Sequence, residues 1–248
     1  MGKTELAKTT SEVYFGSENA MVRFDMSEYQ DQASVARLIG GNGQAGLLTE
    51  AIRKTPFTLL LLDELEKAHS DILNLFLQVM DDGRLTDGLG RTIDFTNVIL
   101  IATSNAGTQF IQDEVQKGTD LAAIKSELME NQLRQVYRPE FLNRFDDVIV
   151  FSPLTQDDVA AITYLMVAKI EERLKAKGLN FQIDDDAVHE LSVQGYDPKF
   201  GARPLRRVLQ DKVENLIAER ILKGDVGRRD TVVYHKGGTI TVEKAAAL

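Results

Sequence analysis

The sequence predicts an α/β protein, with a parallel sheet flanked by helices and then a small α+β domain. Three observations support this prediction. Residues 57–64 form a non-alternating apolar run that ends in Asp63 and Glu64, as in a strand buried on both faces of a parallel sheet. A Gly-Lys-Thr tripeptide at residues 2–4 leads into a helical segment. After Pro153 the pattern changes to longer helical periodicity.

Composition limits the functional classes. The chain has 248 residues and is 43% hydrophobic, which suits one large domain or two small ones. It has no cysteine, which excludes disulfides and cysteine-based metal sites, and its three histidines are too dispersed to form a metal site. The net charge of −9 disfavours a general nucleic-acid surface. Because there is no signal peptide and no apolar run of about 18 residues, we expect a cytoplasmic protein without a membrane partner.

Gly2, Lys3 and Thr4 match the second half of a phosphate-binding loop. In such a loop the backbone N–H groups and the lysine contact the phosphates, and the threonine hydroxyl holds Mg²⁺. A tripeptide of this kind also arises by chance, so its weight depends on the acid-tipped strand that follows it. The first half of the loop and the strand before it are not in the sequence, and we therefore expect the native protein to continue upstream.

The segments between these motifs alternate strands and helices. Residues 40–46 are rich in glycine and predict a flexible loop, whereas residues 82–95 predict a hairpin. The other predicted elements of this half are strands at 21–25, 98–102 and 147–151 and helices at 33–39, 47–54, 70–80 and 121–136.

The second half of the chain predicts a separate small domain. We divide the chain into a large nucleotide-binding domain at 1–151, a small lid domain at 152–243 and a tail at 244–248 that resembles a vector-derived sequence. The small domain is expected to contain helices at 156–177, 185–194 and 203–222 and strands at 179–183, 231–234 and 239–242.

Polar residues end two of the predicted buried strands. Asp63 and Glu64 follow one apolar run, and Thr103, Ser104 and Asn105 follow the next. In open α/β sheets ligands bind at the carboxyl ends of the strands, so these residues predict a ligand site. The plainer alternative is a buried strand followed by an acidic helix cap, and Asn105 could simply end its strand.

Six motifs occur in order along the chain, and together they closely resemble the second ATPase module of the Clp-type AAA+ unfoldases (ClpB, ClpC, ClpE and ClpL). The resemblance covers nearly the whole chain up to about Val242, and six motifs in register are far more specific than any one alone. The motifs are Gly2-Lys3-Thr4, Leu62 to His69, Asp82 to Asp87, Thr103-Ser104-Asn105, Arg138 to Arg144 and Gly201 to Leu205.

The resemblance implies an AAA+ P-loop fold that hydrolyses ATP with Mg²⁺. Lys3 and Thr4, which follow Gly2 in the loop, would contact the β/γ phosphates and Mg²⁺. Asp63 would position Mg²⁺ through water, and Glu64 would polarise the attacking water as the general base. Phosphoryl transfer depends mostly on positioning and charge neutralisation, which suits these residue types.

Three further residues have roles implied by the resemblance. Asn105 would orient the attacking water, Arg144 would be the arginine finger that reaches a neighbouring subunit, and Arg203 would be the sensor arginine of the small domain. The active form would then be a ring, most simply a hexamer, that acts on unfolded or aggregated proteins. From the residues alone, Arg144 could be an ordinary surface arginine and Arg203 a salt-bridge partner at a helix end.

Two departures from the family pattern bear on function. The family has an aromatic Gly-Tyr-Val-Gly pore loop, but no aromatic residue lies between Ile39 and Leu47. Glycine, asparagine and glutamine do not supply the large apolar contact of an aromatic ring, so we expect weak coupling of ATP turnover to threading if the loop is truly absent. Members that bind the ClpP peptidase carry an Ile/Leu/Val-Gly-Phe tripeptide, and no Gly-Phe occurs in this chain, which favours a ClpB-like or ClpL-like disaggregase without ClpP.

Two other functions stay open at this point. A DNA-remodelling AAA+ machine is disfavoured by the Asp-Gly-Arg-Leu-Thr-Asp hairpin and by the acidic net charge. A nucleotide-binding module that only holds a ring together is disfavoured by the intact Glu64 and Arg144, although the truncated phosphate loop favours it.

Overall fold

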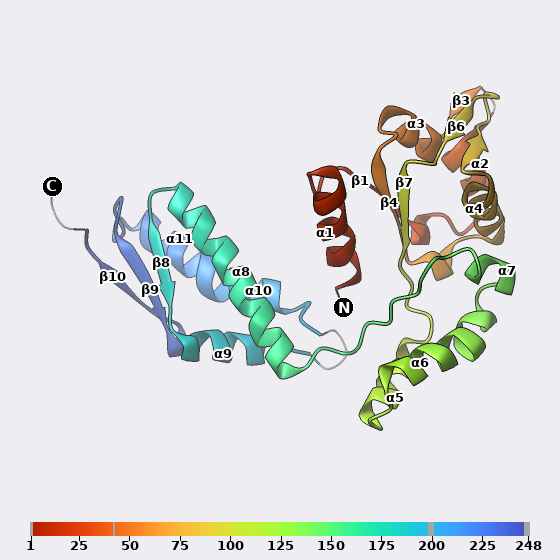
Figure 1. The fold of residues 1–248 in the computed structure, drawn as a ribbon. Helices are drawn as coiled ribbons and strands as arrows, with labels where there is room; N and C mark the ends of the chain where they lie inside the picture. Colours follow the sequence, from red (N-terminus) through yellow and green to blue (C-terminus); the bar gives the residue numbers. More distant parts are fainter. Residues whose placement is uncertain (1, 42, 198–200, 246–248) are drawn as a thin grey trace. The chain divides into compact units, whose positions relative to one another are not determined.

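The computed structural model describes residues 2–41, 43–197 and 201–245. By their contacts, these residues separate into two compact units, one comprising 2–152 and the other beginning at Pro153 (Figure 1). Each unit has its own hydrophobic core. None of the helices in the described part of the chain is long and apolar enough to cross a membrane.

The first unit is built on a parallel sheet of three strands in the order β1-β4-β7. Strand β1 is Met21–Asp25, β4 is Thr58–Asp63 and β7 is Val98–Ala102. Asp25 lies opposite Asp63, and Leu62 lies opposite Ala102, so all three strands end at the same edge. The predicted parallel sheet flanked by helices is confirmed.

The leucines of β4 alternate between two apolar layers. Leu59 and Leu61 are fully buried against Ala7 of helix α1 (Lys3–Phe15). Leu60 and Leu62 point into the larger core on the other side of the sheet, where α2 (Ala33–Ile39), α3 (Leu47–Lys54) and α4 (Ser70–Asp82) pack (Figure 1). Burial on both faces explains why the run does not alternate in polarity.

Within the glycine-rich segment expected to be a loop, the described residues include two short paired strands. Strand β2 (Gly40–Gly41) pairs with β3 (Gln44–Ala45). Glycine is required here, because a Cβ atom on Gly46 would lie 2.2 Å from the carbonyl oxygen of Leu38. The hairpin also touches the second hairpin, β5 (Arg84–Thr86) and β6 (Thr92–Asp94), through a 2.8 Å hydrogen bond from the Gly88 N–H to the Ile39 carbonyl.

Two sequence predictions in the first unit need correction. The strand expected at 147–151 does not form, and these residues pair with none of the strands in the described sheet β1-β4-β7. Helix α5 (Thr108–Gln116) was not predicted. The helix expected at 121–136 is α6 (Leu121–Glu127) continued by π-helical and 3₁₀ turns to Gln135, and a further short helix, α7, is Pro139–Leu142.

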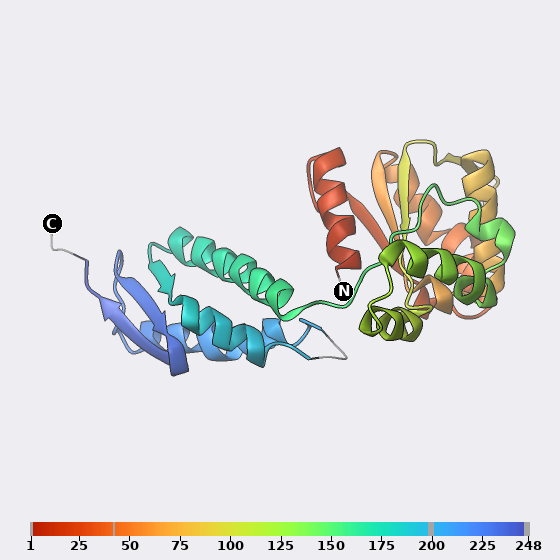
Figure 2. The ribbon, with the colours of Figure 1, turned by 60° about the horizontal axis from the view of Figure 1, so that its bottom comes forward.

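The second unit packs helices on a three-stranded sheet of order β10-β9-β8 (Figure 2). Its helices are α8 (Gln156–Ala176), α9 (Asp185–Gln194), α10 (Leu205–Leu209) and α11 (Asn215–Leu222), and its strands are β8 (Asn180–Ile183), β9 (Thr231–His235) and β10 (Thr239–Glu243). The single helix expected at 203–222 is α10 and α11 joined by a π-helical turn. Of the expected tail, Lys244 and Ala245 both contact Asp230, and 246–248 lie outside the described residues.

Candidate functional site

The predicted site forms where β4 and β7 end. The Asp63 carboxylate accepts a short hydrogen bond from the Thr103 hydroxyl. It also forms an ion pair with Arg23, whose Nη2 atom lies 2.6 Å from Oδ2 of Asp63. Thr103 comes directly after β7, and parallel pairing brings it beside the tip of β4. The two strand tips are therefore locked together by side chains, and Asp63 is held by two donors.

Glu64 turns the chain sharply at the end of β4. Its backbone is left-handed, with φ 55° and ψ 48°, which is uncommon for a residue with a side chain. The Glu64 N–H donates a 3.2 Å hydrogen bond to the Thr103 hydroxyl, which supports this conformation. Strain of this kind concentrates at functional sites and suggests that the direction of the Glu64 side chain matters.

Lys3 brings the start of helix α1 to the tip of β7. Its Nζ donates hydrogen bonds of 2.5 Å to the carbonyl oxygen of Ser104 and 2.8 Å to Oδ1 of Asn105. Gly2 caps the helix in a left-handed conformation with φ 94°, and a Cβ atom there would lie 3.3 Å from the Phe151 ring. Thr4 follows in the first helical turn and is half-buried.

Two side chains that sequence reasoning missed support the Asn105 tip. Glu66 Oε1 accepts the Asn105 N–H at 3.1 Å, while its buried Oε2 has no hydrogen-bond partner among the described residues. Tyr137 donates from its hydroxyl to Ser104 Oγ at 3.0 Å. Burial raises the pKa of Tyr137 to about 12, so the hydroxyl stays protonated and remains a donor.

Among the described residues of the first unit, the predicted Arg144 makes no bond to this cluster. Arg144 follows α7, and its side chain is half-exposed and paired with Asp81. Arg203 lies just before α10 in the second unit, and its side chain is exposed. The structure therefore brings together Lys3, Asp63 and Asn105, with Glu64 beside them.

Comparison with known proteins identifies the family of the chain. A family model described as an AAA domain (Cdc48 subfamily) matches residues 1–148, and one described as the C-terminal, D2-small domain of ClpB protein matches residues 154–234. The chain belongs to the AAA family. The two matches in succession make it a second ATPase module of the Clp type, and membership of this family implies nucleotide binding.

Several relatives of this Clp-type module are known. It is 47% identical to a probable chaperone protein ClpB 1 of Chlorobaculum tepidum, covering 94% of the chain and 56% of that protein. It is 46% identical to a chaperone protein ClpB of Rhodopirellula baltica, covering 96% of the chain and 28% of the relative. It is 42% identical to a ClpC ATP-binding subunit of a Clp protease from Staphylococcus epidermidis, covering 96% of the chain and 31% of the relative.

A solved structure has the same fold as this Clp-type module. A closed-state cryo-EM reconstruction of Hsp104 with ATPγS and FITC-casein matches with a TM-score of 0.82 and 38% identity, over 93% of the chain and 41% of the Hsp104 chain. The module thus spans only part of the length of each of these proteins.

The residues of the Clp-type module fit a nucleotide with Mg²⁺. The Lys3 ammonium lies at the carboxyl edge of the sheet and donates to the oxygen atoms of Ser104 and Asn105, which phosphate oxygens can replace. Asp63 and Thr4 offer the oxygen ligands that Mg²⁺ prefers. No group of three or more carboxylate or histidine side chains that could hold a metal ion occurs in the described part of the chain.

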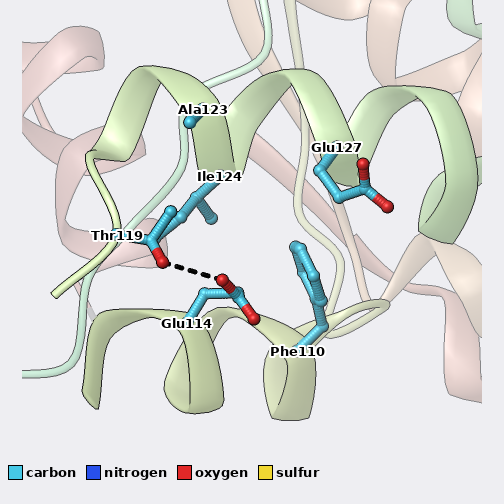
Figure 3. Close-up of a pocket in the computed structure, with 6 residues that line it drawn as sticks. All are labelled: Phe110, Glu114, Thr119, Ala123, Ile124 and Glu127. Atoms are coloured by element: carbon cyan, nitrogen blue, oxygen red, sulfur yellow. Dashed lines mark hydrogen bonds between the residues drawn. The ribbon is translucent and has the colours of Figure 1, made fainter. Parts of the chain in front are cut away.

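A separate hollow of about 350 Å³ lies between α5 and α6 (Figure 3). Phe110, Ala123 and Ile124 form its apolar wall, and Glu114, Thr119 and Glu127 complete it. The two oxygens of Glu114 already accept hydrogen bonds from Lys117 and Thr119. None of the predicted site residues lines this hollow.

Proposed function

We propose that the chain is the ATP-hydrolysing module of a ring-forming protein unfoldase or disaggregase. The observation that carries the proposal is the convergence of Lys3, Asp63, Glu64 and Asn105 on one sheet edge. The relatives are named as chaperones, and the Hsp104 reconstruction contains a protein, casein, which supports protein substrates for this chain also. Nucleic acid and membranes are not proposed partners, and the proposed compartment is the cytoplasm.

Each residue of the cluster has a role in hydrolysis. Lys3 and the backbone N–H groups after Gly2 would bind the β/γ phosphates, and Asp63 and Thr4 would hold Mg²⁺. Mg²⁺, when bound, supplies neutralisation of the phosphate charge. Glu64 accepts the proton of the attacking water, whose position Asn105 fixes. Because Lys3 contacts Ser104 and Asn105 in the described structure, phosphate binding exchanges these oxygens for its own.

The proposed site is completed by arginines from outside this cluster. Arg144 is exposed, with half of its side chain open to solvent, as required of a finger that reaches the γ-phosphate of a neighbouring subunit. Arg203, in the lid at 152–243, reports the nucleotide to that lid. The proposed active form is therefore a closed ring with head-to-tail contacts, a hexamer by family resemblance.

The short hairpin β2–β3 bears on how ATP turnover is coupled to the threading of a substrate protein. No aromatic residue lies between Ile39 and Leu47, so the hairpin lacks the large apolar contact with which a pore loop grips a chain. We propose that ATP turnover in this chain is weakly coupled to threading, and that it works without the ClpP peptidase. A translocation assay that shows full unfolding activity contradicts the weak coupling but leaves the ATPase proposal intact.

The substitution Glu64→Gln tests the function directly. It keeps the size of the side chain and one acceptor oxygen but removes the carboxylate base, so steady-state ATP turnover should fall by about 10²-fold or more while ATP binding is retained. A module that only assembles a ring should lose nothing. Turnover that equals that of the parent chain contradicts the proposal.

A further inference from the structure

Arg144 is held by an acidic side chain from another element. Its Nη1 atom lies 2.7 Å from Oδ1 of Asp81, in the last turn of α4. The pair is on the surface, with 50% of the Arg144 side chain and 37% of the Asp81 side chain exposed. We propose that Asp81 is a positioning residue for Arg144 that presents the guanidinium to the neighbouring subunit's phosphate. This inference rests on the proposed finger role of Arg144.

The backbones on both sides of the pair are anchored in one core. Phe76 and Val79 lie in the same helix as Asp81, within five residues of it, and are buried. Phe141 and Leu142 immediately precede Arg144, are also buried and belong to the same apolar cluster. The main-chain ends of both side chains are thus fixed, so the ion pair orders only the side chains and loses less entropy than a pair between two mobile loops.

A contact between two aromatic rings fixes the turn that carries Arg144. Phe145 packs edge-on against Phe141, with ring centroids 5.4 Å apart, and the Arg144 N–H donates to the Phe141 carbonyl at 3.2 Å. Arg144 therefore lies between two residues that face the core and must direct its own side chain outward. What remains to be set is the direction of the guanidinium, and Asp81 sets it.

The geometry of the pair leaves the guanidinium able to bind a second anion. The ion pair joins Nη1 of Arg144 to Oδ1 of Asp81, and Asp81 is the one acidic partner of Arg144 among the described residues. An arginine has five N–H donors in a planar fork, so Arg144 can keep Asp81 and still place two N–H groups on a phosphate. Asp81 is therefore a support that stays in place during catalysis, and not a latch that must be released.

The test measures steady-state ATP turnover of the assembled protein with Asp81→Asn. Because a surface ion pair contributes at most about 1 kcal/mol, the maximal rate should fall about two- to fivefold, with the KM for ATP and the oligomeric state unchanged. Asp82→Asn is the matched control, because Asp82 is the adjacent acid and makes no ion pair among the described residues. Asp81→Ser is a second variant that removes the charge without an amide group.

Two further experiments distinguish a positioning role of Asp81 from damage to the folded structure. The double variant Asp81→Asn/Arg144→Ala should be no slower than Arg144→Ala alone, because Asp81 acts only through Arg144. In rings with excess Glu64→Gln chains, which supply intact Asp81 and Arg144, an Asp81→Asn chain should turn over as fast as a parent chain diluted in the same way. A defect in the folding of the variant's own site would persist in that mixture.

The outcomes distinguish the two proposals. If Arg144→Ala leaves turnover at the parental value, the proposed function of Arg144 fails. If Arg144→Ala lowers turnover strongly but Asp81→Asn is unchanged, is faster than the parent, or further lowers the residual turnover of Arg144→Ala, only the positioning role of Asp81 is overturned. A faster variant would identify Asp81 as a latch.

Discussion

Thr103 is the side chain that joins the two strand tips of the site. It is only 4% exposed, donates to the Asp63 carboxylate and accepts the N–H of Glu64. One hydroxyl therefore holds both acids of the proposed site in their relative positions. Sequence reasoning identified Thr103 as part of a polar strand tip but gave it no role, because its partners depend on which strands are neighbours.

Thr103→Val should impair both stability and catalysis. The substitution keeps the shape of the side chain but removes one of the two donors to the Asp63 carboxylate and the acceptor of the Glu64 N–H, which should lower the free energy of unfolding by about 1–3 kcal/mol. Turnover at a temperature well below the melting point should also fall, because Asp63 and Glu64 lose their shared contact. Denaturant unfolding and steady-state ATP turnover measure the two effects.

Thr58→Val is the matched control for this prediction. Thr58 begins the same strand β4, is 1% exposed, and donates from its hydroxyl to the Ala20 carbonyl at 2.8 Å. It is at the opposite end of the strand from the site. Its loss should lower stability comparably and leave turnover of the folded protein unchanged. Equal turnover losses in the two variants would show that Thr103 has no specific role.

At the scale of elements, the most predictable feature is β4. Its four consecutive leucines and its two terminal acids indicated a buried strand and a ligand edge, and both faces of the strand are covered. The motifs at Lys3, Asp63 and Asn105 likewise identified residues that meet at one edge. Local sequence patterns could therefore predict which segments are buried strands and which polar residues end them.

Features that depend on distant neighbours were not predictable in this way. Residues 147–151 have a strand-like composition but gain no ladder partner in the described sheet, so they stay irregular. The contact of Glu66 with the Asn105 N–H and the pairs Arg23–Asp63 and Asp81–Arg144 all join residues about 39 to 63 positions apart. The approach of Gly46 to Leu38 is another contact that only the folded backbone reveals.

The connection into β9 is held by a buried acid. Asp230 accepts the N–H groups of Ala245 and Gly227, at 2.9 and 2.7 Å, and pairs with Lys244. These two N–H groups and then Lys244 lower the pKa of Asp230 from 3.8 to about 2. Because the folded carboxyl binds its proton less tightly than the unfolded one, its contribution to stability is complete above about pH 4 and is lost as the pH falls towards 2.

Asp230→Ala should therefore destabilise the C-terminal unit in a pH-dependent manner. The melting temperature of the variant should be lower than that of the parent at pH 7, and the difference should narrow as the pH falls from about 4 to about 2.5. Asp186→Ala is the control, because Asp186 is 78% exposed and its pair with Lys236 should contribute little. Thermal melts followed by circular dichroism at each pH measure the effect. A constant difference at all pH values contradicts the account.

At the scale of the whole molecule, the account requires that each site be completed by a second chain. Lys3, Asp63, Glu64 and Asn105 lie at one sheet edge, whereas the exposed Arg144 is paired with Asp81 and makes no described bond to that edge. In the proposed function, a single chain has the binding and activating groups, and Arg144 serves a different chain. In the proposed head-to-tail ring, one chain's Arg144 would lie at the next chain's site.

The most direct test mixes two chains that are each inactive. Glu64→Gln lacks the base and Arg144→Ala lacks the finger, so rings of either chain alone should show almost no ATP turnover. An equal, randomly assembled mixture should recover about a quarter of the parental rate, because one neighbour pair in four joins an intact Glu64 to an intact Arg144. If the mixture stays as inactive as its components, although it assembles and binds ATP, the site is not shared between chains and the central claim is wrong.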